Sequence, residues 1–236
     1  MKKRIWELDA LRGICILGVI LFHFVFDLTV LYRIVDWDPP ALFTFVQQWG
    51  GTLFVVLSGI CVTLGSRSVR RGLVVFCGGL LVSAVTCGMY AFGFSDRSII
   101  IYFGVLHCLG VCMLLWPVFR KLHWAILAAL GGIFALLGLH FMNLWVDTPW
   151  LILLGLTPHG FVTSDYFPLL PYLGFFLLGA ALGKTLYRNK ASLLPKVNAG
   201  WFPLNFFCFC GRQSLWIYLL HQPLLNGICW LILSLS

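Results

Sequence analysis

Four ionisable side chains share one face of the first long apolar segment, which runs from Leu8 to Leu31. They are Asp9, Arg12, His23 and Asp27. At about 100° per residue in an α-helix, all four fall within a stripe about 60° wide. A charged group at membrane depth costs about 2.5 to 3.5 kcal/mol on insertion scales, so it usually faces a bundle interior or a wet cavity. The stripe therefore indicates a site among helices.

Spacing within the stripe separates a guanidinium from an imidazole. Arg12 and His23 are eleven positions apart, about 16 Å along a helix, so Arg12 lies near the inner membrane surface and His23 at or beyond the midplane. His23 and Asp27, at i and i+4, are predicted to touch, so that the carboxylate orients the imidazole. Asp9 and Arg12 are predicted to pair similarly. Interface anchoring by Asp9 and Arg12, and a helix-end role for Asp27, fit equally well.

Two further histidines are predicted to lie well inside helices. His107 occurs in Phe103-Gly-Val-Leu-His107, and His221 occurs in Tyr218-Leu-Leu-His221-Gln-Pro. Three histidines at similar depth in three helices can converge on one cavity. Each of the two also fits the alternative of a hydrogen-bonded core histidine.

A long connection from Asn143 to Asp165 contains no Lys or Arg. Its Asp147, His159 and Asp165 offer hydrogen bonds to a polyhydroxylated acceptor. The connection is predicted to cap the site, and an interfacial loop without a ligand is the alternative.

The composition requires a membrane around these residues. Apolar residues make up 61% of the 236 and charged residues only 10%, with a mean hydropathy of +0.96, whereas a soluble domain is about 25% charged. Seven runs are long and apolar enough to span about 30 Å of hydrocarbon as helices. They are Leu8–Leu31, Phe43–Gly65, Gly72–Phe92, Ile99–Phe119, Trp124–Phe141, Tyr166–Leu186 and Ser214–Leu233. We predict an all-α polytopic membrane bundle forming a single domain over residues 1–236.

Shorter features complete this interpretation. The apolar pieces Trp150–Leu156 and Trp201–Cys210 are too short to span and are predicted to be interfacial or re-entrant. Gly179 and Gly183, four residues apart, would let two helices approach closely. The nine cysteines do not show zinc spacing, so no metal site is predicted.

Basic residues predict the orientation, because short cytoplasmic loops collect Lys and Arg. Fourteen lie on one side of the predicted bundle, and only Arg33 and Arg97 lie on the other. The fourteen are Lys2, Lys3, Arg4, Arg12, Arg67, Arg70, Arg71, Arg120, Lys121, Lys184, Arg188, Lys190, Lys196 and Arg212. The amino terminus is therefore predicted to be cytoplasmic in a multi-pass protein of the cell (inner) membrane. Topology and anionic lipids account for the net charge of +8, so nucleic-acid binding is not indicated.

Several sequence blocks resemble a known family. Leu8-Asp9-Ala-Leu-Arg12-Gly13, with ten residues between Arg12 and His23, resembles the Arg-x10-His signature of the transmembrane acyltransferase superfamily. Phe22-His23-Phe24 and Asp27-Leu28 are similar to its bacterial branch related to heparan-alpha-glucosaminide N-acetyltransferase. Further similar blocks follow in order: Leu53 to Gly59, Arg67-x2-Arg70, Gly104 to His107, Asp165 to Pro171 and Ser214 to Pro223. The eukaryotic enzymes are thought to use a first-loop histidine, which is absent between Tyr32 and Gln48, so the catalytic histidine stays open.

This resemblance implies transfer of an acyl group from cytoplasmic acetyl-CoA to a glycan or amino-sugar acceptor outside. The basic cluster of Arg67, Arg70, Arg71 and Arg212 would bind the donor's phosphates. Arg12, paired with Asp9, would hold the pantetheine or diphosphate end. His23, oriented by Asp27, would act as general base, and His107 or His221 would stabilise the oxyanion or position the acceptor. We expect His23→Ala to fold and to lose transfer.

Other readings use the same residues. Buried histidines also serve as haem ligands in membrane electron carriers, and intramembrane charges line transporters or flippases of glycan precursors. A covalent acyl-histidine intermediate and a homodimer are both compatible with the sequence, with membrane lipids as surrounding partners.

Overall fold

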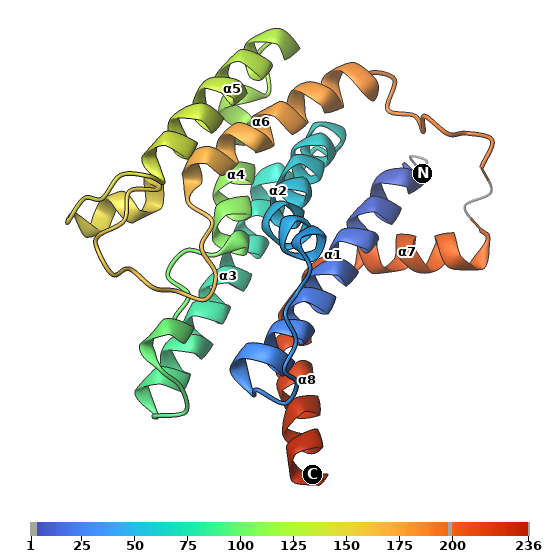
Figure 1. Ribbon diagram of the computed structural model, residues 1–236. Coiled ribbons are helices and arrows are strands. Elements are labelled where there is room, and N and C mark those ends of the chain that lie inside the picture. The colour runs from blue at the N-terminus through green and yellow to red at the C-terminus, as the bar shows by residue number, and fades with distance from the viewer. Residues whose placement is uncertain (1–3, 198–199, 236) are drawn as a thin grey trace. The chain divides into compact units, whose positions relative to one another are not determined.

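The computed structural model describes residues 4–197 and 200–235, and it is built from helices (Figure 1). Within this described part, six helices are long and apolar enough to cross a membrane, and a seventh apolar helix is shorter. The predicted all-α polytopic bundle is thus confirmed. Lys2 and Lys3, which contribute to the predicted orientation, lie outside the described residues.

The chain divides into two compact units. Unit 1 holds the described residues up to Phe54 and those from Lys190 onward, and unit 2 holds Val55–Asn189. Helix α2, Ala41–Leu64, contributes to both units. The assignment of residues 1–236 to one domain stays a prediction.

Unit 1 is built around the first helix. It contains α1 (Trp6–Phe26), which continues into the π-helix η1 (Asp27–Leu31), together with α7 (Phe202–Arg212) and α8 (Ser214–Leu235). Helix α7 crosses the amino-terminal half of α1, and α8 follows α7 after a break at Gln213 (Figure 1). Helix α8 also contacts both α1 and η1.

Glycines let α1 and α7 cross almost backbone to backbone. A Cβ atom built at Gly13 would lie 1.9 Å from the carbonyl oxygen of Phe207, and one at Gly211 would lie 1.8 Å from that of Asp9. No other residue fits either position without moving a helix. This crossing holds α7 directly beside Asp9 and Arg12.

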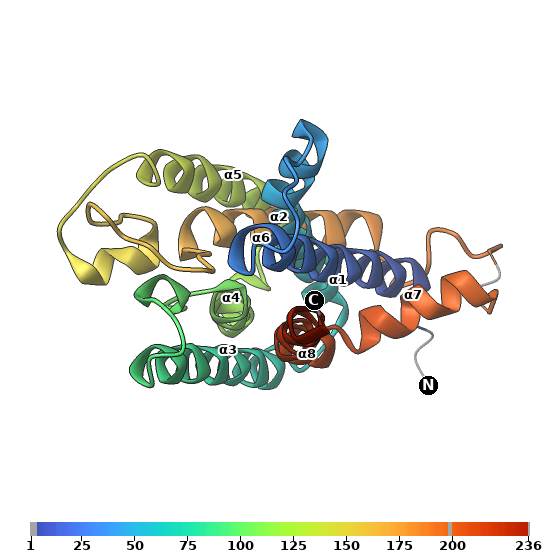
Figure 2. The same ribbon diagram turned by 60° about the horizontal axis from the view of Figure 1, so that its bottom comes forward.

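Unit 2 contains two pairs of packed helices. Helix α3 (Ser68–Ala91) lies beside α4 (Val105–Phe119), and α5 (Trp124–Phe141) lies beside α6 (Leu169–Leu186), as Figure 2 shows. The short helices η2 (Arg97–Ile99) and η3 (Pro149–Leu154) lie in the connections.

Gly179 and Gly183 of α6 face the second half of α2. Their Cβ positions lie 2.1 Å from the carbonyl oxygen of Val56 and 2.9 Å from that of Ile60. The predicted close approach of two helices at this glycine pair is therefore confirmed.

One predicted helix begins later than expected. The run Ile99–Phe119 is helical only from Val105, because Ile100 to Gly104 are non-helical and Phe103 pairs with Tyr166 in an isolated parallel bridge. His107 therefore lies in the first turn of α4, and the prediction that it falls well inside a helix is wrong.

Candidate functional site

Polar side chains of α1 and η1 meet polar side chains of α8 along one line in unit 1. We call this line the α1–α8 seam; its members are Arg12, His23, Asp27, Tyr32, Ser214, His221, Gln222 and Asn226. Helix periodicity explains the α1 members, since they recur on the face that the sequence marks as polar. The seam joins residues about 200 positions apart in the chain.

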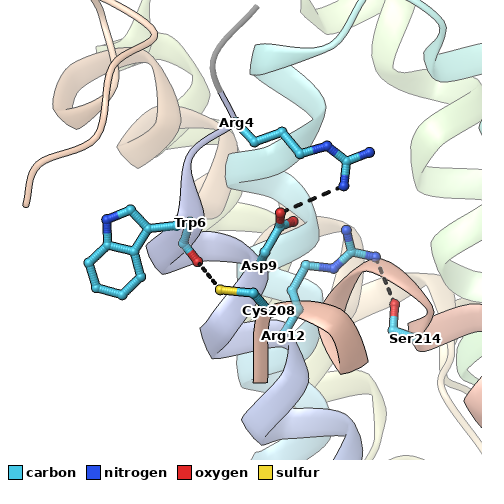
Figure 3. Close-up of polar contacts among 6 residues, drawn as sticks. All are labelled: Arg4, Trp6, Asp9, Arg12, Cys208 and Ser214. Carbon is cyan, nitrogen blue, oxygen red and sulfur yellow. Dashed lines mark hydrogen bonds and ion pairs between the residues drawn. The ribbon is translucent and has the colours of Figure 1, made fainter. Parts of the chain in front are cut away.

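At the end of the seam nearest the start of α1, Arg12 and Asp9 take different partners. Arg12 Nη2 donates to Ser214 Oγ at 3.0 Å, whereas Asp9 forms an ion pair with Arg4 at 3.8 Å, as Figure 3 shows. The predicted Asp9–Arg12 pair is thus replaced by two separate contacts. The Arg12 guanidinium also lies 5.9 Å from the centre of the Phe54 ring, and its buried Nε lacks a partner among the described residues.

In the middle of the seam, His23 and His221 are in contact. Their ring centres lie 4.9 Å apart in an edge-to-face arrangement, with 60° between the planes. His221 Nδ1 donates to the backbone carbonyl of Tyr218 in the preceding turn of α8. His221 Nε2 is buried and has no hydrogen-bond partner in the described part of the chain.

Farther along, Asp27 pairs with Gln222 instead of His23. Gln222 Nε2 donates to both Asp27 carboxylate oxygens, at 3.1 and 3.0 Å, and Asp27 is fully buried. Asp27 also begins the π-helix, a rare geometry that often marks functional sites. The contact expected between His23 and Asp27 gives way to this amide–carboxylate pair.

The seam ends at a tyrosine just beyond the first span. Tyr32 Oη donates to Asn226 Oδ1 at 3.2 Å. Burial, with smaller contributions from Cys229 and Asp27, raises the pKa of Tyr32 above its ordinary value of 10.0. The phenol therefore keeps its proton and acts as a donor.

His107 lies in unit 2 and serves the start of α4. Its Nδ1 accepts from the backbone N–H of Gly104 at 3.3 Å, so Nε2 carries the hydrogen and faces Ser83 Oγ at 3.4 Å. Ser83 Oγ in turn donates to the carbonyl of Ile101 at 2.6 Å. These contacts occupy both ring nitrogens. They account for the burial of His107 by hydrogen bonding alone. Its predicted catalytic role stays untested.

The three residues predicted to bind the acceptor are also in unit 2. An Asp165 carboxylate oxygen accepts from the backbone N–H of Val105 at 3.0 Å, so it caps the amino end of α4. His159 stacks on Trp145, with ring centres 5.0 Å apart and 14° between planes, and Asp147 is exposed. Asp165 thus has a structural task, while contact of Asp147 and His159 with an acceptor stays a prediction.

The predicted phosphate-binding arginines divide between the units. Arg67, Arg70 and Arg71 lie at the amino end of α3 in unit 2 and are exposed. Arg212 ends α7 in unit 1, where it interacts electrostatically with Asp9, as do Arg4 and Arg12. Unit 1 therefore brings three guanidinium groups around one carboxylate.

Comparison with known proteins identifies the family of this chain. The family described as heparan-alpha-glucosaminide N-acetyltransferase, catalytic, matches residues 4–223. The chain belongs to this acetyltransferase family. Among curated proteins and solved structures, nothing matches the chain. A member of the heparan-alpha-glucosaminide N-acetyltransferase family with membrane-length helices is a multi-pass membrane acyltransferase.

Sequence reasoning missed half of the seam of this acetyltransferase-family protein. Ser214, Gln222 and Asn226 were not singled out, and neither was Tyr32. A signal exists in α8, because Ser214, His221, Gln222 and Asn226 are polar residues in a mostly apolar helix. Neutral polar groups within a membrane-length helix, like charged ones, tend to face other helices. Applying this rule to α8 would have found these residues.

Proposed function

We propose that the protein transfers an acetyl group from acetyl-CoA on the cytoplasmic side to a sugar hydroxyl or amine on the other side of the membrane. The observation that supports this most strongly is the contact of the half-buried His23 with the buried His221, whose Nε2 has no partner among the described residues, in a seam that reaches a guanidinium. Family membership supports acyl transfer, and the seam supplies a base for it.

The donor binds at the inner end of the seam. Arg4, Arg12 and Arg212 surround the single carboxylate of Asp9, which leaves an excess of positive charge there. Guanidinium groups bind phosphate oxygens in bidentate geometry, and the free Nε of Arg12 is one such donor. Arg67, Arg70 and Arg71 form a second basic cluster on the predicted cytoplasmic side.

The reaction needs one proton acceptor. A hydroxyl or amine of the acceptor attacks the thioester carbonyl carbon while an imidazole nitrogen of the His23–His221 pair takes its proton. The C–S bond then breaks, a C–O or C–N bond remains, and the imidazolium returns the proton to the CoA sulfur. The products are the acetylated acceptor and free CoA, so no other reactant is needed.

Acetyl-CoA turnover by the detergent-solubilised protein tests the proposal. The panel includes glucosamine, methyl glucoside and envelope glycans, and the products are separated from hydrolysed acetate. Alkaline hydroxylamine cleaves an oxygen-ester product but not an amide, so it distinguishes hydroxyl from amine transfer. Steady consumption of acetyl-CoA without any acetylated acceptor would contradict the proposal.

Arg12→Lys tests the donor site. We expect the apparent KM for acetyl-CoA to rise about tenfold, because a lysine keeps the charge but loses the planar fork and the Nε donor. The KM for the acceptor should stay near its wild-type value. Arg33→Lys, at an exposed arginine after η1, is the matched control, and an unchanged donor KM in Arg12→Lys would remove Arg12 from the donor site.

The seam argues against the haem alternative. An iron with two axial imidazoles holds them on opposite faces of a porphyrin, whereas His23 and His221 touch edge to face. That contact leaves no space for a macrocycle between the rings. A transporter would move the acceptor without consuming thioester, so the turnover assay separates that reading as well.

A further inference from the structure

Two buried acceptor atoms of α8 have no partner within the described residues. They are Nε2 of His221 and Oε1 of Gln222. An unpaired buried polar atom carries a desolvation cost, so native proteins usually pair such atoms with protein, water or ligand. These two belong to neighbouring residues, of which His221 contacts α1 and Gln222 contacts η1.

The hydrogen-bonding role of the Gln222 oxygen is fixed by Asp27. A carboxylate only accepts hydrogen bonds, so the amide must turn its NH2 group toward it, as both N–O distances show. The Gln222 carbonyl oxygen is then directed away from Asp27. It can only accept a hydrogen bond.

The backbone fixes the role of His221 in the same way. Nδ1 faces the carbonyl of Tyr218 and must donate to it, so the neutral ring carries its lone pair on Nε2. Helix α8 thus presents two hydrogen-bond acceptors to the seam at this level. A ligand that satisfies both must supply two hydrogens.

Spacing along α1 restricts how these hydrogens are arranged. His221 contacts His23 and Gln222 contacts Asp27, four residues farther along, which is about 6 Å of helix axis. The two acceptors belong to adjacent residues of α8, so two donors on neighbouring carbons of one ring suit them. A single hydroxyl supplies one hydrogen and can satisfy only one of them.

We propose that His221 Nε2 and Gln222 Oε1 together bind two neighbouring donor groups of the acyl acceptor, either an amine beside a hydroxyl or two vicinal hydroxyls. Gln222 is thereby a specificity-determining residue, and Asp27 is the positioning residue that orients it. The assignment deepens the proposed function and rests on it, since the bound molecule is the acceptor of that reaction.

Small ring probes test the assignment directly. They are trans-2-aminocyclohexanol and trans-cyclohexane-1,2-diol, each compared with the single-donor probe cyclohexanol. Binding is measured as the concentration-dependent rise in unfolding temperature of the detergent-solubilised protein, which needs no turnover. We expect wild type to prefer at least one vicinal probe over its single-donor partner by about tenfold, the value of one buried hydrogen bond. The two probe pairs show whether the amine or the hydroxyl pair is bound.

Gln222→Leu should abolish this preference and leave the affinity for the single-donor probe within about threefold of wild type. Its KM for acetyl-CoA should be unchanged. Gln48→Leu, which removes an exposed glutamine of α2, is the matched control and should keep the preference. A general loss of structure would instead lower the unfolding temperature without ligand and weaken both members of each probe pair.

Exchanging the amide of Gln222 and the carboxylate of Asp27 tests whether Asp27 acts by orienting residue 222 or only by packing against it. Gln222→Glu alone leaves two carboxyl groups facing each other and should lose the preference. The double variant Asp27→Asn with Gln222→Glu restores one N–H···O contact with the donor on α1 and keeps an acceptor oxygen at position 222. We expect it to recover the preference to within about threefold.

The outcomes for the two proposals differ. If wild type acetylates its acceptor but shows no vicinal preference, or if Gln222→Leu keeps that preference, the assignment of Gln222 is overturned and the proposed function stands. If wild type transfers no acetyl group, the proposed function fails. The binding assay does not depend on turnover, so comparing wild type with Gln222→Leu still shows whether His221 and Gln222 bind two neighbouring donors.

Discussion

Replacing either histidine of the seam by alanine should lower acetyl transfer by about 10³-fold, within the range of about 10² to 10⁴ for loss of a general acid or base. In His221→Ala the nitrogen that accepts the proton is gone. In His23→Ala the ring that packs against His221 is gone, and with it the second titratable group of the pair. The measurement is kcat/KM for acetyl transfer to the best acceptor of the panel.

Non-additivity is the distinguishing feature of this prediction. Because the two rings are in contact, we expect them to act on the same proton, so the double variant should be little slower than either single variant. His140→Ala, which removes an exposed histidine in the last turn of α5, is the control and should transfer normally. Wild-type rates in His221→Ala would refute its role as base, and losses that multiply in the double variant would show that the rings act independently.

The contacts of His107 explain why it is absent from this prediction. Both of its ring nitrogens are engaged at the start of α4, with Gly104 and with Ser83. The apolar residues before His107 did not reveal that it lies at a helix start. A run of apolar residues predicts one continuous helix whether or not its first residues are extended. The glycine at the helix start was the available signal, since Gly104 adopts an extended conformation as the N-cap residue.

The α1 side of the site could be predicted from the sequence because helical periodicity reports which residues share a face. It placed Arg12, His23 and Asp27 together, and all three lie in the seam. Periodicity does not report which other helix that face meets. The partners of Arg12 and Asp27 are Ser214 and Gln222, about 200 residues away, and only packing determines that choice.

Local pairing rules also failed for a physical reason. The i, i+4 rule predicted that His23 would contact Asp27, and the i, i+3 rule predicted that Asp9 would pair with Arg12. Such pairs contribute only about 0.2 to 0.5 kcal/mol, and burial favours partners that satisfy a carboxylate more fully. Gln222 offers Asp27 a hydrogen bond to each oxygen, which is the stronger arrangement in a site away from water.

The largest structural effect should come from the crossing of α1 and α7. We expect Gly211→Ala to destabilise the protein by about 3 kcal/mol, at the upper end of the range for overpacked sites, and to lower the unfolding temperature by about 10 °C. The new Cβ would lie 1.8 Å from the carbonyl oxygen of Asp9 and 3.0 Å from the backbone nitrogen of Gly13. These are backbone atoms, so relief requires the helices to move apart rather than a side chain to rotate.

Gly18→Ala on the same helix α1 is the matched control. Its Cβ would meet only a ring atom of Phe22 at 4.0 Å, and alanine is the better helix former, so its unfolding temperature should be unchanged or slightly higher. Unfolding is followed by tryptophan fluorescence in detergent. Because α7 leads directly into α8, separation at Gly211 should also break the Arg12–Ser214 contact, and residual folded Gly211→Ala should show a raised KM for acetyl-CoA. Equal stability of the two variants would mean that α1 and α7 do not cross at these glycines.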